Sequence, residues 1–180
     1  MLDMVLTKRE KMLLSGDKFE FVVATKLLSM FDYPILIKRQ FYDARIYRSM
    51  ECDLIFVTPF KIYCIECKHY KGYIAGNKFD KDWILASSGR KNTFQNPYLL
   101  NKRRIRVMRG FFYKNNYNPP SIENVIVVPD SCAIHSDYKK VFNVTDFINL
   151  VTMDSVTNKS IYRERQLAEF IFNCSTRRFN

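Results

Sequence analysis

Apolar residues at two different spacings define the first elements of the chain. In residues 17–31 they recur at helical spacing, and the segment stops before a proline, which predicts a helix. Residues 35–42 alternate between apolar and polar side chains, as a half-buried strand does. In that strand, Ile35, Ile37 and Phe41 are expected to share one face.

Two apolar runs then form a predicted hairpin. Residues 52–57 and 62–68 have the composition of buried strands, and the tetrapeptide TPFK between them contains Pro59, a turn signal. With TPFK as the turn, Val57 pairs with Ile62, and this pair fixes the register of the hairpin.

The second half of the chain predicts helices around one strong strand. A basic amphipathic helix is expected over residues 97–112, and its apolar stripe consists of Ile105, Met108 and Phe112. The remaining elements are a strand over 124–128, a short helix near 145–151 and a final helix near 160–173. This order predicts a mixed α/β fold in which helices cover a central sheet, and 180 residues fit a single domain.

The hairpin register brings two acidic residues face to face. Asp53 lies directly across from Glu66, with Cβ atoms expected roughly 4.5–5.5 Å apart. Two carboxylates at this distance repel each other unless a positive charge lies between them, and a divalent cation bound through oxygen supplies that charge. Lys68 projects from the same strand face as Glu66, toward the same place.

An ordinary structural interpretation of these residues stays open. Glu51 lies across from Lys68, and the two could form a cross-strand ion pair while Asp53 points to solvent. Against this, Asp53 and Glu66 are embedded in nearly continuous apolar strands, where unpaired acidic side chains are costly. The surroundings therefore favour a metal site.

Glu20 adds a third carboxylate on the predicted helix. It shares a stripe with Ala24 and Leu27, so it should face the sheet. Alternatively, Asp17 and Glu20 have the spacing of a capping box, in which Glu20 would only secure the start of the helix. We favour a role in the active site.

Residues 51–77 read ECDLIFVTPFKIYCIECKHYKGYIAGN, and this segment resembles the core of the NERD, or nuclease-related, domain of the PD-(D/E)XK nuclease superfamily. The similarity covers roughly residues 15–130 and includes Gly16 with Glu20, Trp83, and FQNP at 94–97. It implies a restriction-endonuclease-like fold, in which a mixed central β-sheet is flanked by helices.

The resemblance also implies metal-dependent endonuclease chemistry on the phosphodiester bonds of DNA. Asp53 and Glu66 would bind Mg²⁺, for which Mn²⁺ can substitute, and Lys68 would orient or activate the attacking water. The other positions carried over are Glu20, the acidic residue of the helix, and Gln95 and Asn96, beside the active site.

One position departs from the family pattern. A glutamine is common shortly after the NP step, whereas this chain has Leu100 followed by Asn101, which leaves that glutamine's contacts in doubt but not the metal core. The superfamily also has members without catalysis, so a catalytically silent nucleic-acid-binding or protein-interaction module is the alternative function. The presence of Asp53, Glu66 and Lys68 favours an enzyme.

An excess of basic residues indicates a polyanionic partner. The chain has 29 Lys and Arg against 18 Asp and Glu, a net charge of +11, which favours nucleic acid first and an anionic membrane second. We expect DNA, with RNA less favoured. The helix residues expected to contact it are Lys102, Arg103, Arg104, Arg106 and Arg109. A solvated helix face is the plainer alternative, although like charges so close together repel one another. Three lysines could extend the patch: Lys71, Lys78 and Lys81.

The cysteines and histidines suggest no second site. Five cysteines are an odd number without framework spacing, as expected for reduced core residues. Cys64 and Cys67 form a CxxC pair, but residues three apart on a strand face opposite ways. We expect His69 and His135 to be structural or exposed.

We also expect no targeting signal. Its N-terminus is charged throughout, and no apolar run is long enough to cross a membrane, so we expect a cytoplasmic protein without membrane contact. A homo-oligomer, or a separate helicase or sensor partner, is compatible with the sequence.

Overall fold

A mixed sheet of six strands forms the centre of the computed structural model, which describes residues 18–43, 48–118, 121–158 and 163–177. Its strands are β1 (Ile35–Asp43), β2 (Arg48–Val57), β3 (Ile62–Cys67), β7 (Ile122–Val128), β9 (Val141–Asn143) and β10 (Thr176–Arg177). In the order β10-β1-β2-β3-β7-β9, the first three pairs are antiparallel and the last two are parallel. The predicted mixed α/β fold is confirmed.

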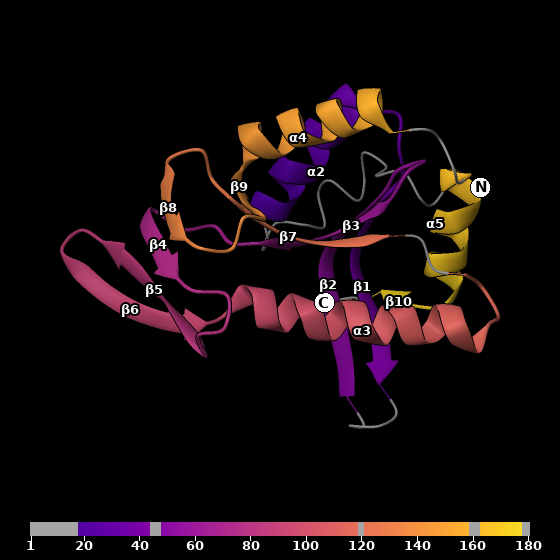
Figure 1. The fold of residues 1–180 in the computed structure, drawn as a ribbon, viewed down its shortest axis with the longest axis horizontal. Coiled ribbons are helices and arrows are strands. Elements are labelled where there is room, and N and C mark those ends of the chain that lie inside the picture. Colours follow the sequence, from indigo (N-terminus) through magenta and orange to yellow (C-terminus); the bar gives the residue numbers. More distant parts are fainter. Residues whose placement is uncertain (1–17, 44–47, 119–120, 159–162, 178–180) are drawn as a thin grey trace.

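Helices cover both faces of this sheet (Figure 1). On one face lie α2 (Lys18–Met30) and α4 (Val144–Thr157), and on the other lie α3 (Pro97–Lys114) and α5 (Glu164–Asn173). We call the two hydrophobic layers between them the α2/α4 core and the α3/α5 core. No described helix is long and apolar enough to cross a membrane.

The predicted helices and hairpin agree closely with the observed ones. The α3 stripe is buried as expected at Ile105, Met108 and Phe112. The TPFK turn is closed by Thr58, whose backbone and hydroxyl both donate to the carbonyl of Lys61. The predicted short helix near 145–151 is wrong in length, since α4 runs from Val144 to Thr157. Gly16, Asp17 and the first residues of the predicted final helix lie outside the described residues.

A second sheet, absent from the sequence-based prediction, lies beside the first at the amino end of α3 (Figure 1). Its order is β6-β5-β4-β8, from the strands β4 (Gly72–Gly76), β5 (Asp82–Ser87), β6 (Arg90–Gln95) and β8 (Cys132–Ser136). Its core centres on Trp83, which is fully buried. A Cβ on Gly76 would lie 2.3 Å from that indole, so the packing requires glycine there.

Strand β1 turns over in its middle. Ile37 packs in the α2/α4 core, whereas Phe41 lies in the α3/α5 core and Arg39 donates hydrogen bonds to Ser175, which follows α5. Lys38 between them has a φ of +50°, which is uncommon for a residue with a side chain and reverses the faces of the strand. The prediction that Phe41 shares a face with Ile35 and Ile37 is therefore wrong.

Strand β2 also breaks the alternation of its side chains between the two faces of the sheet, next to the same part of β1. Leu54 belongs to the α2/α4 core and pairs with Ile37, whereas Cys52 belongs to the α3/α5 core and pairs with Arg39. Asp53 lies between them in the strand, opposite Lys38. We call this interruption of the alternation, at Lys38 in β1 and Asp53 in β2, the phase break. It thus falls on a predicted active-site residue.

Candidate active site

The carboxylates of Asp53 and Glu66 lie where β2 and β3 separate. The predicted register is confirmed from Val57–Ile62 to Leu54–Ile65, and the ladder stops one step before Asp53 and Glu66. The side chain of Asp53 instead accepts the backbone N–H of Cys67, at 2.9 Å. β3 continues its pairing on the other side, with β7.

Glu66 is a buried carboxylate held by two cations. Its side chain is only 1% exposed, and the Lys68 ammonium lies 2.7 Å from one of its oxygens. The guanidinium of Arg104 on α3 donates to the other oxygen. Since a carboxylate is costly to bury without compensation, these two cations offset the cost of burying Glu66.

The surroundings of Asp53 disfavour its charge. Burial, and next the charge of Glu66, raise the pKa of Asp53 to about 7, although Arg104, the Cys67 N–H and Lys68 act in the opposite direction. Burial alone would lower the pKa of Lys68, but the charges of Glu66 and Asp53 outweigh it and raise that pKa. The charged form of Asp53 is therefore disfavoured, whereas the protonated form of Lys68 is favoured.

The ordinary ion pair considered for Glu51 and Lys68 is wrong. Glu51 lies 4.0 Å from the ammonium of Lys38 and accepts from the side-chain amide of Gln40 at 3.2 Å. Lys68 turns to Glu66 instead, as expected for two residues on the same strand face.

Glu20 lies in the first turn of α2 and is half-buried. Its charge contributes, after burial and Asp53, to a raised pKa of the Cys67 thiol, which places it on the Cys67 side of β3. The neighbouring Phe19 stacks on His69 with ring centroids 5.2 Å apart. Glu20 thus lies on the side of the sheet opposite Arg104, and its role in catalysis stays a prediction.

Gln95 and Asn96 have different surroundings. Gln95 ends β6, is exposed and pairs with Asp82, and no described hydrogen bond joins it to Asp53 or Glu66. Asn96 is fully buried; its oxygen caps α3, and its amide donates to three carbonyl groups of residues 77–80. Asn96 therefore fixes the start of the helix that carries Arg104, while a catalytic role for Gln95 stays a prediction.

Asn101 is a buried residue whose role the sequence did not reveal. Its side-chain amide donates to the Cys64 carbonyl at 2.7 Å and to Asn124 at 2.9 Å, and its oxygen accepts from the Cys64 thiol at 3.1 Å. It thereby joins α3 to β3 and β7. A polar residue one turn before Ile105 and two turns before Met108, on the apolar face of a helix, was the available signal.

The CxxC pair is not a site in this fold. Cys64 lies in the α3/α5 core and Cys67 in the α2/α4 core, on opposite faces of β3 as expected. All five cysteines are free thiols. Among the described residues, no group of three or more His, Cys, Asp or Glu side chains is arranged to hold a metal.

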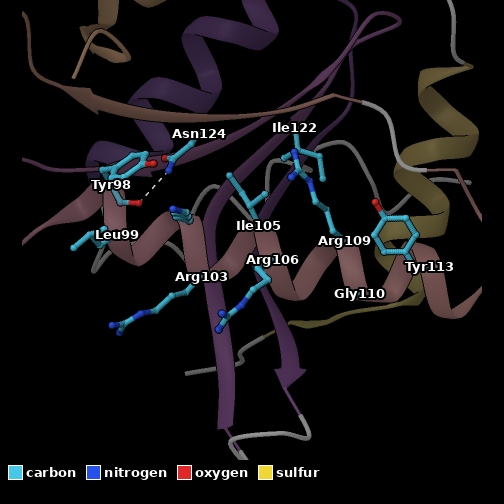
Figure 2. Close-up of a pocket in the computed structure, with 11 residues that line it drawn as sticks. Tyr98, Leu99, Arg103, Ile105, Arg106, Arg109, Gly110, Tyr113, Ile122 and Asn124 are labelled. Carbon is cyan, nitrogen blue, oxygen red and sulfur yellow. Dashed lines mark hydrogen bonds between the residues drawn. The ribbon is translucent and has the colours of Figure 1, made fainter. Parts of the chain in front are cut away.

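The other four basic residues that the sequence singled out on α3 are exposed: Lys102, Arg103, Arg106 and Arg109. They line a groove of about 770 Å³ between the outer side of α3 and the start of β7 (Figure 2). This α3 groove contains Tyr98, Lys102, Arg103, Arg106, Arg109 and Tyr113. The Tyr98 ring lies 5.3 Å from the Lys78 ammonium and 5.8 Å from that of Lys102, so Lys78 adds to the groove's charge. Figure 2 shows Arg103 and Arg106 extending from α3 on the side away from Asn124.

Comparison with known families adds one decisive observation. The nuclease-related domain, NERD, matches residues 15–129, which is more than half of the chain. This chain belongs to the NERD family. Searches of curated proteins and of solved structures returned no match.

The NERD match contains all the predicted site residues. It runs from the segment before α2 through β7, and so includes both carboxylates, Lys68 and the whole of α3. The parts that follow it, α4 and α5, complete the helical layers on the two faces of the sheet. Membership of the NERD family indicates a nuclease-related function and nucleic acid as the partner.

Proposed function

We propose that this protein is an endonuclease that hydrolyses phosphodiester bonds in DNA with the help of Mg²⁺. The observation that carries the proposal is the meeting of Asp53, Glu66 and Lys68 at the point where β2 and β3 separate. Two carboxylates and an ammonium group in one partly buried site are the residue types that metal-assisted hydrolysis requires.

The carboxylate pair fits a divalent cation. The pKa of Asp53 is raised by burial and by the charge of Glu66, so a cation bound to the two carboxylates would favour the charged form of Asp53. Oxygen ligands suit Mg²⁺, and Mn²⁺ would substitute; water and phosphate oxygens would complete the ligand set. When bound, the ion would supply charge stabilisation to the phosphate and the leaving oxygen.

Lys68 is the residue that we assign to the reacting phosphate. Its ammonium lies one strand step beyond Glu66 and is held protonated there. In that position it orients the attacking water and adds positive charge where the phosphate becomes more negative in the transition state. Because Glu66 is buried, its surroundings have a low dielectric constant. The attraction between the Lys68 ammonium and the phosphate is therefore stronger than it would be in water.

The α3 groove is the surface that we assign to the DNA backbone. Lys102, Arg103, Arg106 and Arg109 are exposed, lie on one helix and carry charge that an anionic partner would neutralise. These contacts would position the DNA without reading its sequence.

Cleavage of supercoiled plasmid tests the proposal. We expect conversion to nicked or linear forms in Mg²⁺ and in Mn²⁺, and no conversion in EDTA. The matched control is Asp53→Asn, which keeps an oxygen acceptor for the Cys67 N–H but removes a carboxylate. Cleavage that is equally fast in EDTA, or in Asp53→Asn, would refute the assignment.

One observation supports the alternative of a catalytically silent module. Arg104 already neutralises Glu66, as a permanent ion pair would in a protein that binds no metal. If the wild-type protein cleaves neither duplex DNA, single-stranded DNA nor RNA in Mg²⁺ or Mn²⁺ but still binds them, this alternative is correct. Cleavage of RNA alone would instead identify an RNA nuclease.

A further inference from the structure

Arg104 differs from the other basic residues of its helix. Its side chain is 15% exposed and points to the sheet, whereas the neighbouring Arg103 is exposed on the outer face of α3. Its guanidinium donates to one oxygen of Glu66, and the Lys68 ammonium holds the other oxygen at 2.7 Å. Both oxygens of this carboxylate are thus engaged by cations of the chain itself.

Such an arrangement compensates the buried charge of Glu66 without a metal ion. A divalent cation bound to the same carboxylate would replace the guanidinium, because two cations in contact with one oxygen repel each other. Arg104 and the cation therefore compete for Glu66.

We propose that Arg104 is a displaceable counter-ion, which occupies Glu66 until a divalent cation binds and then moves to a phosphate of the nucleic acid. The inference rests on the proposed function, since it requires a cation at Asp53 and Glu66. A phosphate that approaches those carboxylates also approaches Arg104, and a guanidinium pairs well with phosphate oxygens. Release of Arg104 by one ligand therefore favours binding of the other, so cation and nucleic acid bind cooperatively.

Calorimetric titration of the metal-free protein with Mn²⁺ tests the competition. Arg104→Gln should bind Mn²⁺ at least about tenfold more tightly than wild type, since a charge-assisted hydrogen bond no longer has to be broken. The matched control is Arg103→Gln, which removes the same charge one residue away but leaves Glu66 paired. Equal or weaker Mn²⁺ binding by Arg104→Gln would overturn the proposal.

A second comparison separates failure of this inference from failure of the proposed function. Asp53→Asn should abolish Mn²⁺ binding; if it does not, the cation site itself is wrong. If Asp53→Asn abolishes binding while Arg104→Gln and wild type bind equally, the site stands and only the competition is refuted. Should Arg104→Gln fold poorly in a thermal melt, Arg104→Lys replaces it. That variant lacks the planar fork of donors and should also bind Mn²⁺ more tightly than wild type.

The cooperativity is measured with Ca²⁺, which permits binding without rapid cleavage, and a short DNA duplex. In wild type, Ca²⁺ should tighten DNA binding by the same factor, about tenfold, by which DNA tightens Ca²⁺ binding. In Arg104→Gln this factor should fall, to the part that the direct contact between cation and phosphate supplies. An unchanged factor in Arg104→Gln would overturn the transfer of Arg104 to the phosphate.

Discussion

Asp53→Asn should make the metal-free protein more stable, and by an amount that depends on pH. The substitution keeps the shape of the side chain and an oxygen that can accept the Cys67 N–H. It removes a carboxylate that is partly buried beside Glu66 and whose pKa is raised to about 7. A side chain that lowers the stability of the fold is expected at a functional site, where it is kept for binding or catalysis.

The size and sign of the effect follow from linkage between protonation and folding. Between the usual pKa of 3.8 and the folded pKa of about 7, the folded protein binds more protons at Asp53 than the unfolded chain does. Stability therefore falls as pH rises through this window, by about 4 kcal/mol in total. Allowing for the remaining solvent exposure of Asp53, we expect Asp53→Asn to gain about 2–4 kcal/mol at pH 8 and almost nothing at pH 4.

Thermal unfolding in EDTA from pH 4 to pH 8.5 measures this difference. For a chain of this length the gain at pH 8 corresponds to roughly 4–16 °C in Tm. Mn²⁺ should raise the Tm of wild type at pH 8 and leave that of Asp53→Asn unchanged, because the second carboxylate is gone. A difference between the two proteins that is the same at pH 4 and pH 8 would refute the argument from charge.

Three other predictions concern catalysis, DNA binding and the frame of the site. Lys68→Ala should bind DNA in Ca²⁺ almost normally but cleave it roughly 10²-fold more slowly in single-turnover assays, and equal rates would remove Lys68 from the chemistry. Replacing Arg103, Arg106 and Arg109 with Ala should make DNA affinity less dependent on salt. The slope of log affinity against log salt should become less steep by about 0.9 for each phosphate that is no longer neutralised, and an unchanged slope would mean that DNA lies elsewhere. Asn96→Ala should lower the free energy of unfolding in urea by about 2–4 kcal/mol, because the helix loses its cap and the carbonyl groups that accept from Asn96 are left unpaired. A loss under about 0.5 kcal/mol would show that the buried amide contributes little.

The hairpin and the basic helix could be predicted because local rules determine them. A proline-containing turn of four residues sets the pairing of Val57 with Ile62, and the pairs as far as Leu54 with Ile65 follow from that register. The start of α3 follows from Asn96 and Pro97, a capping residue followed by a proline at the first helical position. These local rules were sufficient to bring Asp53, Glu66 and Lys68 together from the sequence alone.

Long-range packing decided the features that the sequence did not reveal. The positive φ of Lys38 depends on two cores that claim different ends of β1, and nothing in the segment ILIKRQFYD marks it. The second sheet was missed because its strands are short, and β6 exposes nearly every side chain, so no apolar alternation appears.

Arg104 was predicted as one of five equivalent charges on α3, because helical spacing alone does not say which side chain meets a buried acid. Residues 101 and 108 lie three and four positions away and are both buried, so Arg104 falls on the inner half of the helix. A basic residue on an apolar helix face requires an acidic partner, and Glu66 was the available one. That combination would have separated Arg104 from its neighbours.

The phase break at Lys38 and Asp53 makes the position of one carboxylate depend on both sides of the molecule. On one side of the break, Ile37 and Leu54 lie in the α2/α4 core; on the other side, Phe41 and Cys52, two or four positions along the same strands, lie in the α3/α5 core. Asp53 thus lies where the two strands pass from one core to the other, and the packing of both cores determines its position. A cavity opened in either core, for instance at Phe41 or Phe56, would let the packing around it relax. The Asp53 carboxylate would then shift by a fraction of an ångström. Natural variation deep in either core can therefore adjust the active site without changing any residue that lines it.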